Sequence, residues 1–290
     1  MNKTLLCFLL LLAAGLWSCR PADRKPSADG RPLLTASIAP LSYLVEQIAG
    51  PAYEVRTLMP AGSSPETYEP TPGQMVDVSE SQAYFSVGTL GFETSLLQRL
   101  SESSPELRCI RLFEGLKPLP QSHAHSANRY DPHVWTSPQN ARLMARRICQ
   151  ELCELDSTQA TAFRQRLTRF ETRLDSLEQA LRQRFAHVSA RSFLIYHPSL
   201  AYFAQEFGLQ QIPLEADGKE PSPSRLAALI QATREKARKG QVKLIFVQRE
   251  NTGRSVQQVA RQTGLRVVTI DPLSGQWMQQ MDLISKSLAQ

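Results

Sequence analysis

The sequence predicts an α/β fold made of two lobes, each with a parallel sheet flanked by helices, joined by one long, rigid helix. Two observations lead to this prediction. In both halves of the chain, short strand-like apolar runs alternate with helix-like segments, an order typical of parallel sheets. Between the halves, residues 156–188 carry one uninterrupted helical pattern. The 290 residues are enough for one large or two ordinary domains.

The chain begins with the pattern of an export signal. Lys3 precedes an apolar run from Leu5 to Trp17 that is too short for a membrane span. The pair Ser18-Cys19 follows, and a small residue before a cysteine resembles the bacterial lipobox. This resemblance implies cleavage before Cys19 and acylation of Cys19. We therefore expect a signal peptide at 1–18 and a lipidated, flexible tether at 19–32. The alternative is an ordinary signal with a chance cysteine.

The N-terminal α/β lobe is expected over residues 33–155. Strands are predicted at 33–38, 53–59, 83–87 and 108–112, with helices at 42–49, 74–81 and 93–101. Cys149 and Cys153 are four residues apart on a further helix, a geometry that does not favour a disulfide between them. We interpret both as small core residues, with a pairing of Cys109 to one of them as the minority alternative.

The linking helix is predicted over residues 156–188. Its apolar residues recur at intervals of three and four, and neither Gly nor Pro interrupts them: Ala160, Phe163, Leu167, Phe170, Leu174, Leu177, Leu181, Phe185 and Val188. Asp156 or Ser157 can cap its start. At 1.5 Å per residue the helix would be roughly 45–50 Å long, more than the width of a small domain. It should therefore span both lobes; a self-associating coiled coil is the alternative.

The C-terminal α/β lobe is expected over residues 189–290. Strands are predicted at 192–196, 211–215, 242–247 and 266–270. Helices are predicted at 200–207, 224–236 and 255–263, with a last helix that runs through residue 288. Ligands of open α/β sheets bind beyond the carboxyl ends of the strands. A site between two such lobes would draw on loops from both.

The charge of the chain excludes one class of function. The formal net charge is +6, and it becomes +5 when residues 1–18 and their single charge, Lys3, are removed. The basic residues are scattered, without a basic stripe or a recognisable nucleic-acid-binding module. We therefore expect no nucleic-acid partner.

Four groups are candidates for binding a divalent metal. His197 and Asp271 each directly follow a predicted strand, and Glu66 lies in the loop after another. His133 lies in the segment Asp131-Pro132-His133-Val134-Trp135. Taken alone, each has an ordinary structural explanation, because histidines are often capped or core residues and an aspartate before proline is common in turns. Together, histidine and carboxylate in converging loops indicate a metal site.

Several segments, in this order along the chain, resemble the zinc/manganese solute-binding lipoproteins of bacterial ABC importers (cluster A-I, or cluster 9). The most specific is Asp131-Pro132-His133-Val134-Trp135-Thr136-Ser137-Pro138. The resemblance runs over nearly all of the mature chain, and its other segments are Pro65-Glu66-Thr67-Tyr68-Glu69-Pro70-Thr71-Pro72, Tyr196-His197-Pro198, Lys219-Glu220-Pro221-Ser222 and Thr269-Ile270-Asp271-Pro272-Leu273. The family fold, two Rossmann-like lobes on a rigid helix, agrees with the prediction made above from the sequence pattern.

The resemblance also implies a ligand set and a role. It assigns His133, His197 and Asp271 as metal ligands, with Glu66 where the family usually has histidine. Two nitrogens and two carboxylates suit Zn²⁺ and leave Mn²⁺ or Fe²⁺ as alternatives; a water could also replace Glu66. His123 and His125 resemble a reduced form of the metal-gathering loop of zinc-type members. The implied protein is a monomer on the outer side of the membrane, held there by a lipid anchor. It delivers metal to the permease and ATPase of an importer and is not an enzyme.

Three other functions remain as alternatives. A zinc hydrolase would need a metal-bound water and a general base, for which only Glu69 or Glu215 is available, and no His-Glu-x-x-His motif is present. A binding protein for an organic chelate would need a wide aromatic or arginine-lined cleft. An adhesion role through the long helix is equally compatible with export and lipidation.

Overall fold

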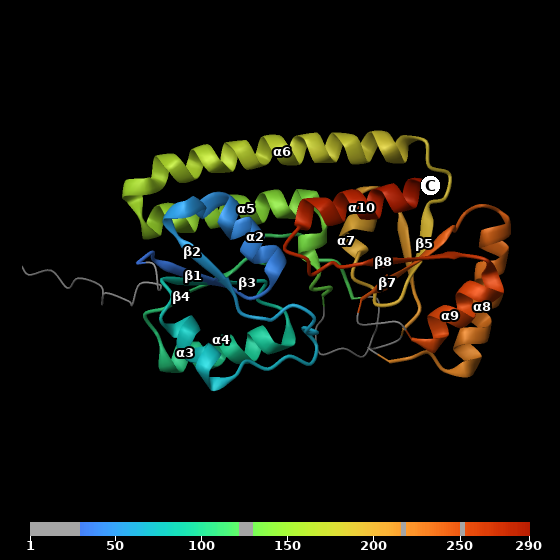
Figure 1. The fold of residues 1–290 in the computed structure, drawn as a ribbon, viewed down its shortest axis with the longest axis horizontal. Helices are drawn as coiled ribbons and strands as arrows, with labels where there is room; N and C mark the ends of the chain where they lie inside the picture. The colour runs from blue at the N-terminus through green and yellow to red at the C-terminus, as the bar shows by residue number, and fades with distance from the viewer. Residues whose placement is uncertain (1–29, 122–129, 216–218, 250–252) are drawn as a thin grey trace, which may run out of the picture.

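The computed structural model describes residues 30–121, 130–215, 219–249 and 253–290. The chain forms two α/β lobes side by side, with one long helix along both (Figure 1). Each lobe has a four-stranded, fully parallel sheet, in the order β2-β1-β3-β4 in the first and β6-β5-β7-β8 in the second. The predicted fold class is therefore confirmed.

The two sheets follow the same path through the chain. In each, the first strand is central, the second adds to one side of it, and the third and fourth add to the other. The side of the sheet on which the next strand is added therefore switches between β1 and β3, and again between β5 and β7. At such a reversal the loops beyond the carboxyl ends diverge and leave a crevice for a ligand. The carboxyl end of β5 leads directly to His197.

The elements of the N-terminal lobe lie close to their predicted positions. They are β1 (Leu33–Ala36), α2 (Ala39–Ala49), β2 (Glu54–Thr57), α3 (Pro72–Ser79), β3 (Ala83–Ser86), α4 (Gly91–Ser103), β4 (Arg108–Arg111) and α5 (Pro138–Leu155). No bounds were predicted for α5, although Cys149 and Cys153 were placed on a helix. Its start is well marked, because the Ser137 side chain accepts a hydrogen bond from Asn140 N and Pro138 is the first helical residue.

The elements of the C-terminal lobe also match the predicted order. They are β5 (Ser192–Ile195), α7 (Ala201–Glu206), β6 (Gln210–Pro213), α8 (Pro223–Arg238), β7 (Leu244–Gln248), α9 (Arg254–Thr263), β8 (Arg266–Ile270) and α10 (Trp277–Ala289). Strand β7 is buried along its whole length, as expected for a central strand of a parallel sheet. Among the described residues, no helix has both the length and the hydrophobicity of a membrane span.

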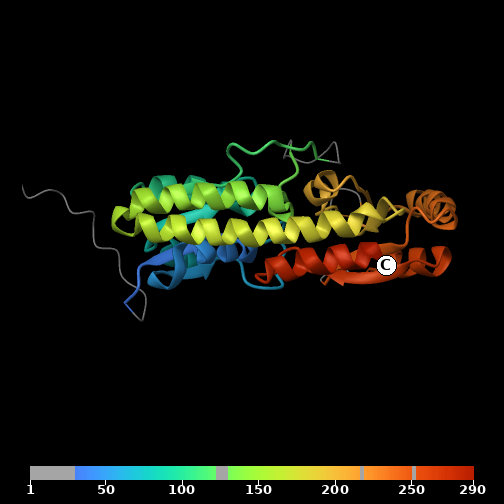
Figure 2. The ribbon, with the colours of Figure 1, turned by 90° about the horizontal axis from the view of Figure 1, so that it is seen from above.

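The linking helix α6 (Ala160–Ala186) packs against both lobes, as Figure 1 and Figure 2 show from two sides. It is 27 residues, or about 40 Å, long. Near its start Phe163 contacts Tyr53 of the N-terminal lobe (ring centroids 6.0 Å apart), and near its end Phe185 contacts Phe207 of the C-terminal lobe (5.4 Å). Helices α2, α5 and α10 pack along it. The predicted apolar face of α6 thus packs against helices of the same chain, as expected for a helix that spans both lobes.

The start of the long helix differs in detail from the prediction. Residues 157–159 form a short 3₁₀ turn before α6, and the Asp156 side chain accepts a hydrogen bond from Thr158 N of that turn. Asp156 also accepts a hydrogen bond from Tyr53 Oη at 3.1 Å. Asp156 therefore caps the turn and ties it to the N-terminal lobe.

Hydrogen bonds between buried groups join the two lobes near His133. Trp135 donates its indole Nε1–H to the carbonyl of Pro272 (2.8 Å), and Trp277 donates its own to the carbonyl of Trp135 (2.7 Å). Tyr202 of α7 donates to the carbonyl of Asp131 (3.0 Å). Because the partners are 71 to 142 residues apart in sequence, these bonds fix the segment around His133 against the C-terminal lobe.

Candidate metal centre

Two histidines, one from each lobe, face each other. His197 follows β5 by two residues, and His133 directly precedes the 3₁₀ turn Val134–Thr136. Their Nε2 atoms are 3.2 Å apart and the ring centroids 5.0 Å apart. Nitrogens bound to one tetrahedral zinc at about 2.05 Å are about 3.3 Å from each other. The two rings therefore already have the spacing of two ligands of a single ion.

Each histidine is held at its other nitrogen by a carboxylate. His133 Nδ1 is 2.8 Å from Asp131 Oδ1, and His197 Nδ1 is 2.6 Å from Glu215 Oε1. Asp131 Oδ1 also accepts the main-chain N–H of His133 at 2.8 Å. A neutral imidazole that donates from Nδ1 to a carboxylate has its lone pair on Nε2, the nitrogen through which these two rings face each other. This carboxylate–histidine arrangement is usual where histidine binds a metal.

The environment of His197 changes its acidity. Burial lowers the pKa of His197, but the hydrogen bond and charge of Glu215, together with the negative charges of Glu66 and Asp131, raise it. The net result is a pKa above the ordinary value of a histidine. In the described part of the chain, the ion pairs of His133 and His197 are all with carboxylates. This concentration of negative charge favours a cation beside the two histidines.

Glu66 reaches this cluster from the N-terminal lobe. Its Oε1 is 3.5 Å from His197 Nδ1, and its side chain is 54% exposed, against 6% for Glu215. The ligand atoms of Glu66, His197 and Glu215 all lie within 4.8 Å of one another. His197 is thus close to two other predicted ligands, with His133 at its Nε2 and Glu66 at its Nδ1, whereas His133 does not belong to that group of three.

Asp271 lies on the loop after β8, with a different set of contacts. Its Oδ1 accepts a hydrogen bond from Leu273 N (3.1 Å), and its own main-chain N–H donates to Gln280 Oε1 (3.1 Å). It does not belong to the group of described residues whose ligand atoms gather within 4.8 Å. The next residue, Pro272, is the one that Trp135 holds. The predicted role of Asp271 as a ligand therefore stays a prediction.

Three residues of the site were not predicted in the roles that they have here. Glu215 was considered only as a general base, yet it accepts a hydrogen bond from His197. Asp131 was part of a motif, and its position two residues before His133 was the available signal. Gln248, the last residue of β7, accepts the His197 N–H (3.2 Å) and donates to the His197 carbonyl (2.8 Å). The position of Gln248, directly after the predicted strand 242–247, was a local signal, but it gave no role because the partners of Gln248 are about fifty residues away.

Other predicted features lie elsewhere. His123, His125 and Cys19 are outside the described residues. Cys109, Cys149 and Cys153 are not bridged to one another, so the minority pairing of Cys109 to Cys149 or Cys153 is not formed. His187 is exposed at the end of α6.

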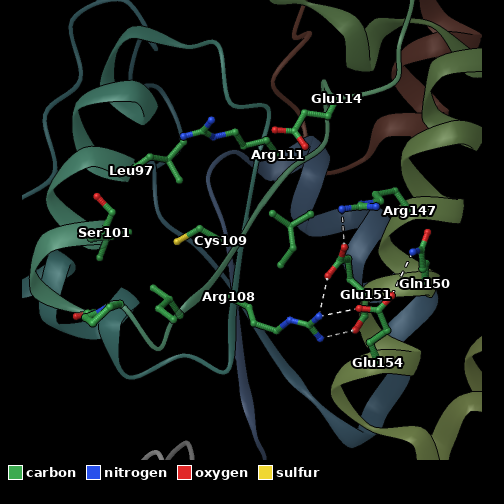
Figure 3. A pocket seen from close by; sticks show the side chains of 15 residues that line it. Leu97, Ser101, Arg108, Cys109, Arg111, Glu114, Arg147, Gln150, Glu151 and Glu154 are labelled. Atoms are coloured by element: carbon green, nitrogen blue, oxygen red, sulfur yellow. Dashed lines mark hydrogen bonds and ion pairs between the residues drawn. The ribbon is translucent and has the colours of Figure 1, made fainter.

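A cavity of about 670 Å³ lies between α4, β4 and α5 (Figure 3), and neither histidine is among the residues that line it. Two of its three arginines are paired with glutamates: Arg108 contacts Glu154 at 2.7 Å and Glu151 at 3.5 Å, and Arg147 contacts Glu151 at 2.8 Å. No aromatic side chain is among the residues that line it. With two of its three arginines paired to glutamates and no aromatic ring in its lining, this cavity is not the aromatic or arginine-lined cleft expected for an organic chelate.

Comparison with known proteins agrees with the fold and the site. Residues 34–290 match the family model of ZnuA, the periplasmic component A of the zinc-uptake complex. A zinc-bound crystal structure of a ZnuA deletion mutant superposes with a TM-score of 0.82 at 32% identity, covering 89% of this chain and 97% of that one.

Two curated relatives show the range of the family. The high-affinity zinc uptake system protein ZnuA of Bacillus subtilis is 23% identical over 294 residues, which cover 95% of this chain and 88% of that protein. The manganese ABC transporter substrate-binding lipoprotein PsaA of Streptococcus mitis is 23% identical over 281 residues, covering 92% and 87%. The chain belongs to the ZnuA family. It is a metal-binding solute-binding protein of zinc/manganese ABC uptake systems.

Proposed function

We propose that this protein captures Zn²⁺ outside the cytoplasmic membrane and delivers it to the permease and ATPase of an ABC importer. The observation that carries the proposal is the His133–His197 pair, whose Nε2 atoms are 3.2 Å apart with each Nδ1 held by a carboxylate. Two imidazoles at this spacing fit zinc, which accepts histidine and carboxylate ligands in a tetrahedral arrangement.

Glu66 and Asp271 are proposed to complete the ligand set. Glu66 is the more exposed, with its carboxylate 3.5 Å from His197 Nδ1, so it can turn toward an ion at Nε2. Asp271 lies on the loop whose Pro272 carbonyl is bonded to Trp135, two residues from His133. Two ionised carboxylates would neutralise the charge of a divalent ion. Four protein ligands also close a tetrahedral site to an activated water, which favours binding over catalysis.

Zinc is proposed over manganese because of the two imidazole nitrogens. Imidazole suits zinc, whereas manganese favours oxygen ligands. The zinc-bound ZnuA structure is the relative that supports this choice, and the manganese-binding PsaA is the one that supports the alternative. A lipid anchor at Cys19 and a monomeric state complete the proposal. The export signal and the lipobox-like segment support the anchor.

Calorimetric titration tests the proposal. The chain from residue 20 onward, stripped with a chelator, would be titrated separately with Zn²⁺ and Mn²⁺. We expect one tight zinc site, lost in His133→Ala and His197→Ala, and weakened in Glu66→Ala and Asp271→Ala. His187→Ala is the matched control, because His187 is exposed at the end of α6 and should bind zinc like the wild type.

Each other outcome has a defined meaning. Tighter binding of Mn²⁺ than of Zn²⁺ would move the protein to the manganese branch. Unchanged zinc binding in Glu66→Ala or in Asp271→Ala would remove that residue from the ligand set. The central proposal is wrong if neither metal binds in a one-to-one ratio.

A further inference from the structure

His197 uses its two ring nitrogens in different ways. Its Nε2 faces His133, while its Nδ1 is 2.6 Å from Glu215 and 3.5 Å from Glu66. The separation of 2.6 Å is that of a strong hydrogen bond to a carboxylate. It is too short for two ligands of one zinc ion, which would be about 3.3 Å apart. Glu215 is therefore a hydrogen-bond acceptor for His197 rather than a partner ligand of a metal at Nδ1.

The Glu215 carboxylate is placed by rigid surroundings. Glu215 lies two residues beyond the end of β6. Leu214 N donates to the Ile195 carbonyl (2.8 Å) and Glu215 N donates to the Tyr196 carbonyl (3.3 Å), both at the end of β5. Arg225 of α8 donates to the Glu215 carbonyl (3.4 Å). Its side chain is 6% exposed. The carboxylate therefore comes from the same sheet as its histidine and has little room to move.

The main chain of His197 is fixed as well. The Gln248 amide accepts the His197 N–H and donates both to the His197 carbonyl (2.8 Å) and to Ser199 Oγ (3.0 Å). With the main chain fixed by β7 and Nδ1 bonded to Glu215, rotation of the ring is restricted. The remaining freedom is the choice of tautomer, and a carboxylate at Nδ1 selects the Nδ1–H form.

We infer that Glu215 is a positioning residue of this site, which holds His197 in the Nδ1–H tautomer and keeps its Nε2 lone pair directed at the metal. The inference rests on the proposed function, because it takes Nε2 of His197 as the metal-binding atom. The Glu66 carboxylate also approaches His197 Nδ1, but its distance is 0.9 Å longer than that of Glu215 and its side chain is largely exposed. Glu66 therefore does not set the tautomer.

Two variants and two measurements test the inference. Glu215→Ala removes the acceptor, and Glu215→Gln keeps the shape and an acceptor oxygen without the charge. The first measurement is the ¹⁵N chemical shifts of His197 in metal-free protein with labelled histidine, at about pH 8, assigned by comparison with His197→Ala. The second is zinc affinity by chelator competition. Glu151→Gln is the matched control, because Glu151 is also a buried glutamate but pairs with arginines far from the histidines.

We expect the wild type and Glu215→Gln to show the Nδ1–H tautomer, and Glu215→Ala to place the proton of His197 partly on Nε2. The zinc affinity of Glu215→Ala should fall by about 10–100-fold, the usual effect of losing an outer-sphere partner. Glu215→Gln should lose less, and Glu151→Gln should match the wild type. A Glu215→Ala protein with the wild-type tautomer, or with wild-type affinity, would overturn the inference.

The two proposals fail in different ways. If the wild type binds neither zinc nor manganese, the proposed function fails, and the tautomer measurement still decides whether Glu215 positions the ring. If the wild type binds zinc and Glu215→Ala binds it equally well, the function stands and the role of Glu215 is wrong. Thermal unfolding of both variants separates loss of the fold from loss of the tautomer, because an unfolded variant would also lose its cooperative transition.

Discussion

Substituting Trp135 with phenylalanine should weaken both the junction of the lobes and the metal site. Trp135 is 1% exposed, and its indole N–H donates to the Pro272 carbonyl at 2.8 Å. Pro272 follows Asp271, and Trp135 is two residues beyond His133. This one hydrogen bond therefore connects a histidine of one lobe with a proposed ligand of the other. Phenylalanine keeps an aromatic ring at the position but has no donor.

The expected loss of stability comes from two terms. The Pro272 carbonyl would lose its indole donor in a buried interface, which costs about 1–3 kcal/mol. The smaller ring would leave a cavity that costs about 1 kcal/mol more. The sum is about 3 kcal/mol, which for a chain of this size lowers Tm by about 6–12 °C. Metal affinity should fall too, because the Asp271 loop loses its attachment to the His133 segment.

Thermal unfolding followed by circular dichroism, with and without zinc, measures the first effect, and chelator competition measures the second. Trp277→Phe is the matched variant, because it removes the other indole bond of the same junction, to the Trp135 carbonyl at 2.7 Å. It should destabilise by a similar amount but affect metal affinity less, since it leaves the Asp271 loop attached. The reasoning is refuted if Trp135→Phe melts within about 2 °C of the wild type.

Two further predictions concern acidity and a buried carboxylate. Metal binding should weaken on acidification, because a histidine must lose its proton to bind a metal. Since the pKa of His197 is raised, the metal affinity should begin to fall at a pH above that at which an ordinary histidine is half protonated. Chelator competition across pH 5.5–8 would measure this fall. An affinity that is flat over this range would contradict the assignment of His197. Glu93→Ala should lose about 3 kcal/mol or more in urea unfolding, because the buried Glu93 carboxylate accepts three main-chain N–H groups of the loop 87–90, whereas Glu93→Gln should lose less. Equal stability of the two variants would argue against these bonds.

Local patterns predicted the helices and strands well where one face is buried. Helix α6 was expected from the repeat of apolar residues such as Phe163, Phe170 and Leu181, and these side chains are buried in the core. Helix α5 has a similar repeat of apolar residues, including Met144, Ile148 and Leu152, which are buried. The errors at the ends of elements, such as the 3₁₀ turn before α6, reflect capping contacts with residues distant in sequence. Tyr53, for example, bonds to Asp156 across 103 positions.

The sequence by itself determined the two-lobe order, the long helix and the candidates Glu66, His133, His197 and Asp271, because each depends on local periodicity or on a short motif. Only the tertiary structure decided which atoms of these residues face one another. The 3.2 Å approach of the two Nε2 atoms and the hold of Glu215 on His197 depend on strands that pair across the sheet and on indole bonds between lobes. Such contacts join residues far apart in the chain, so no local pattern specifies them.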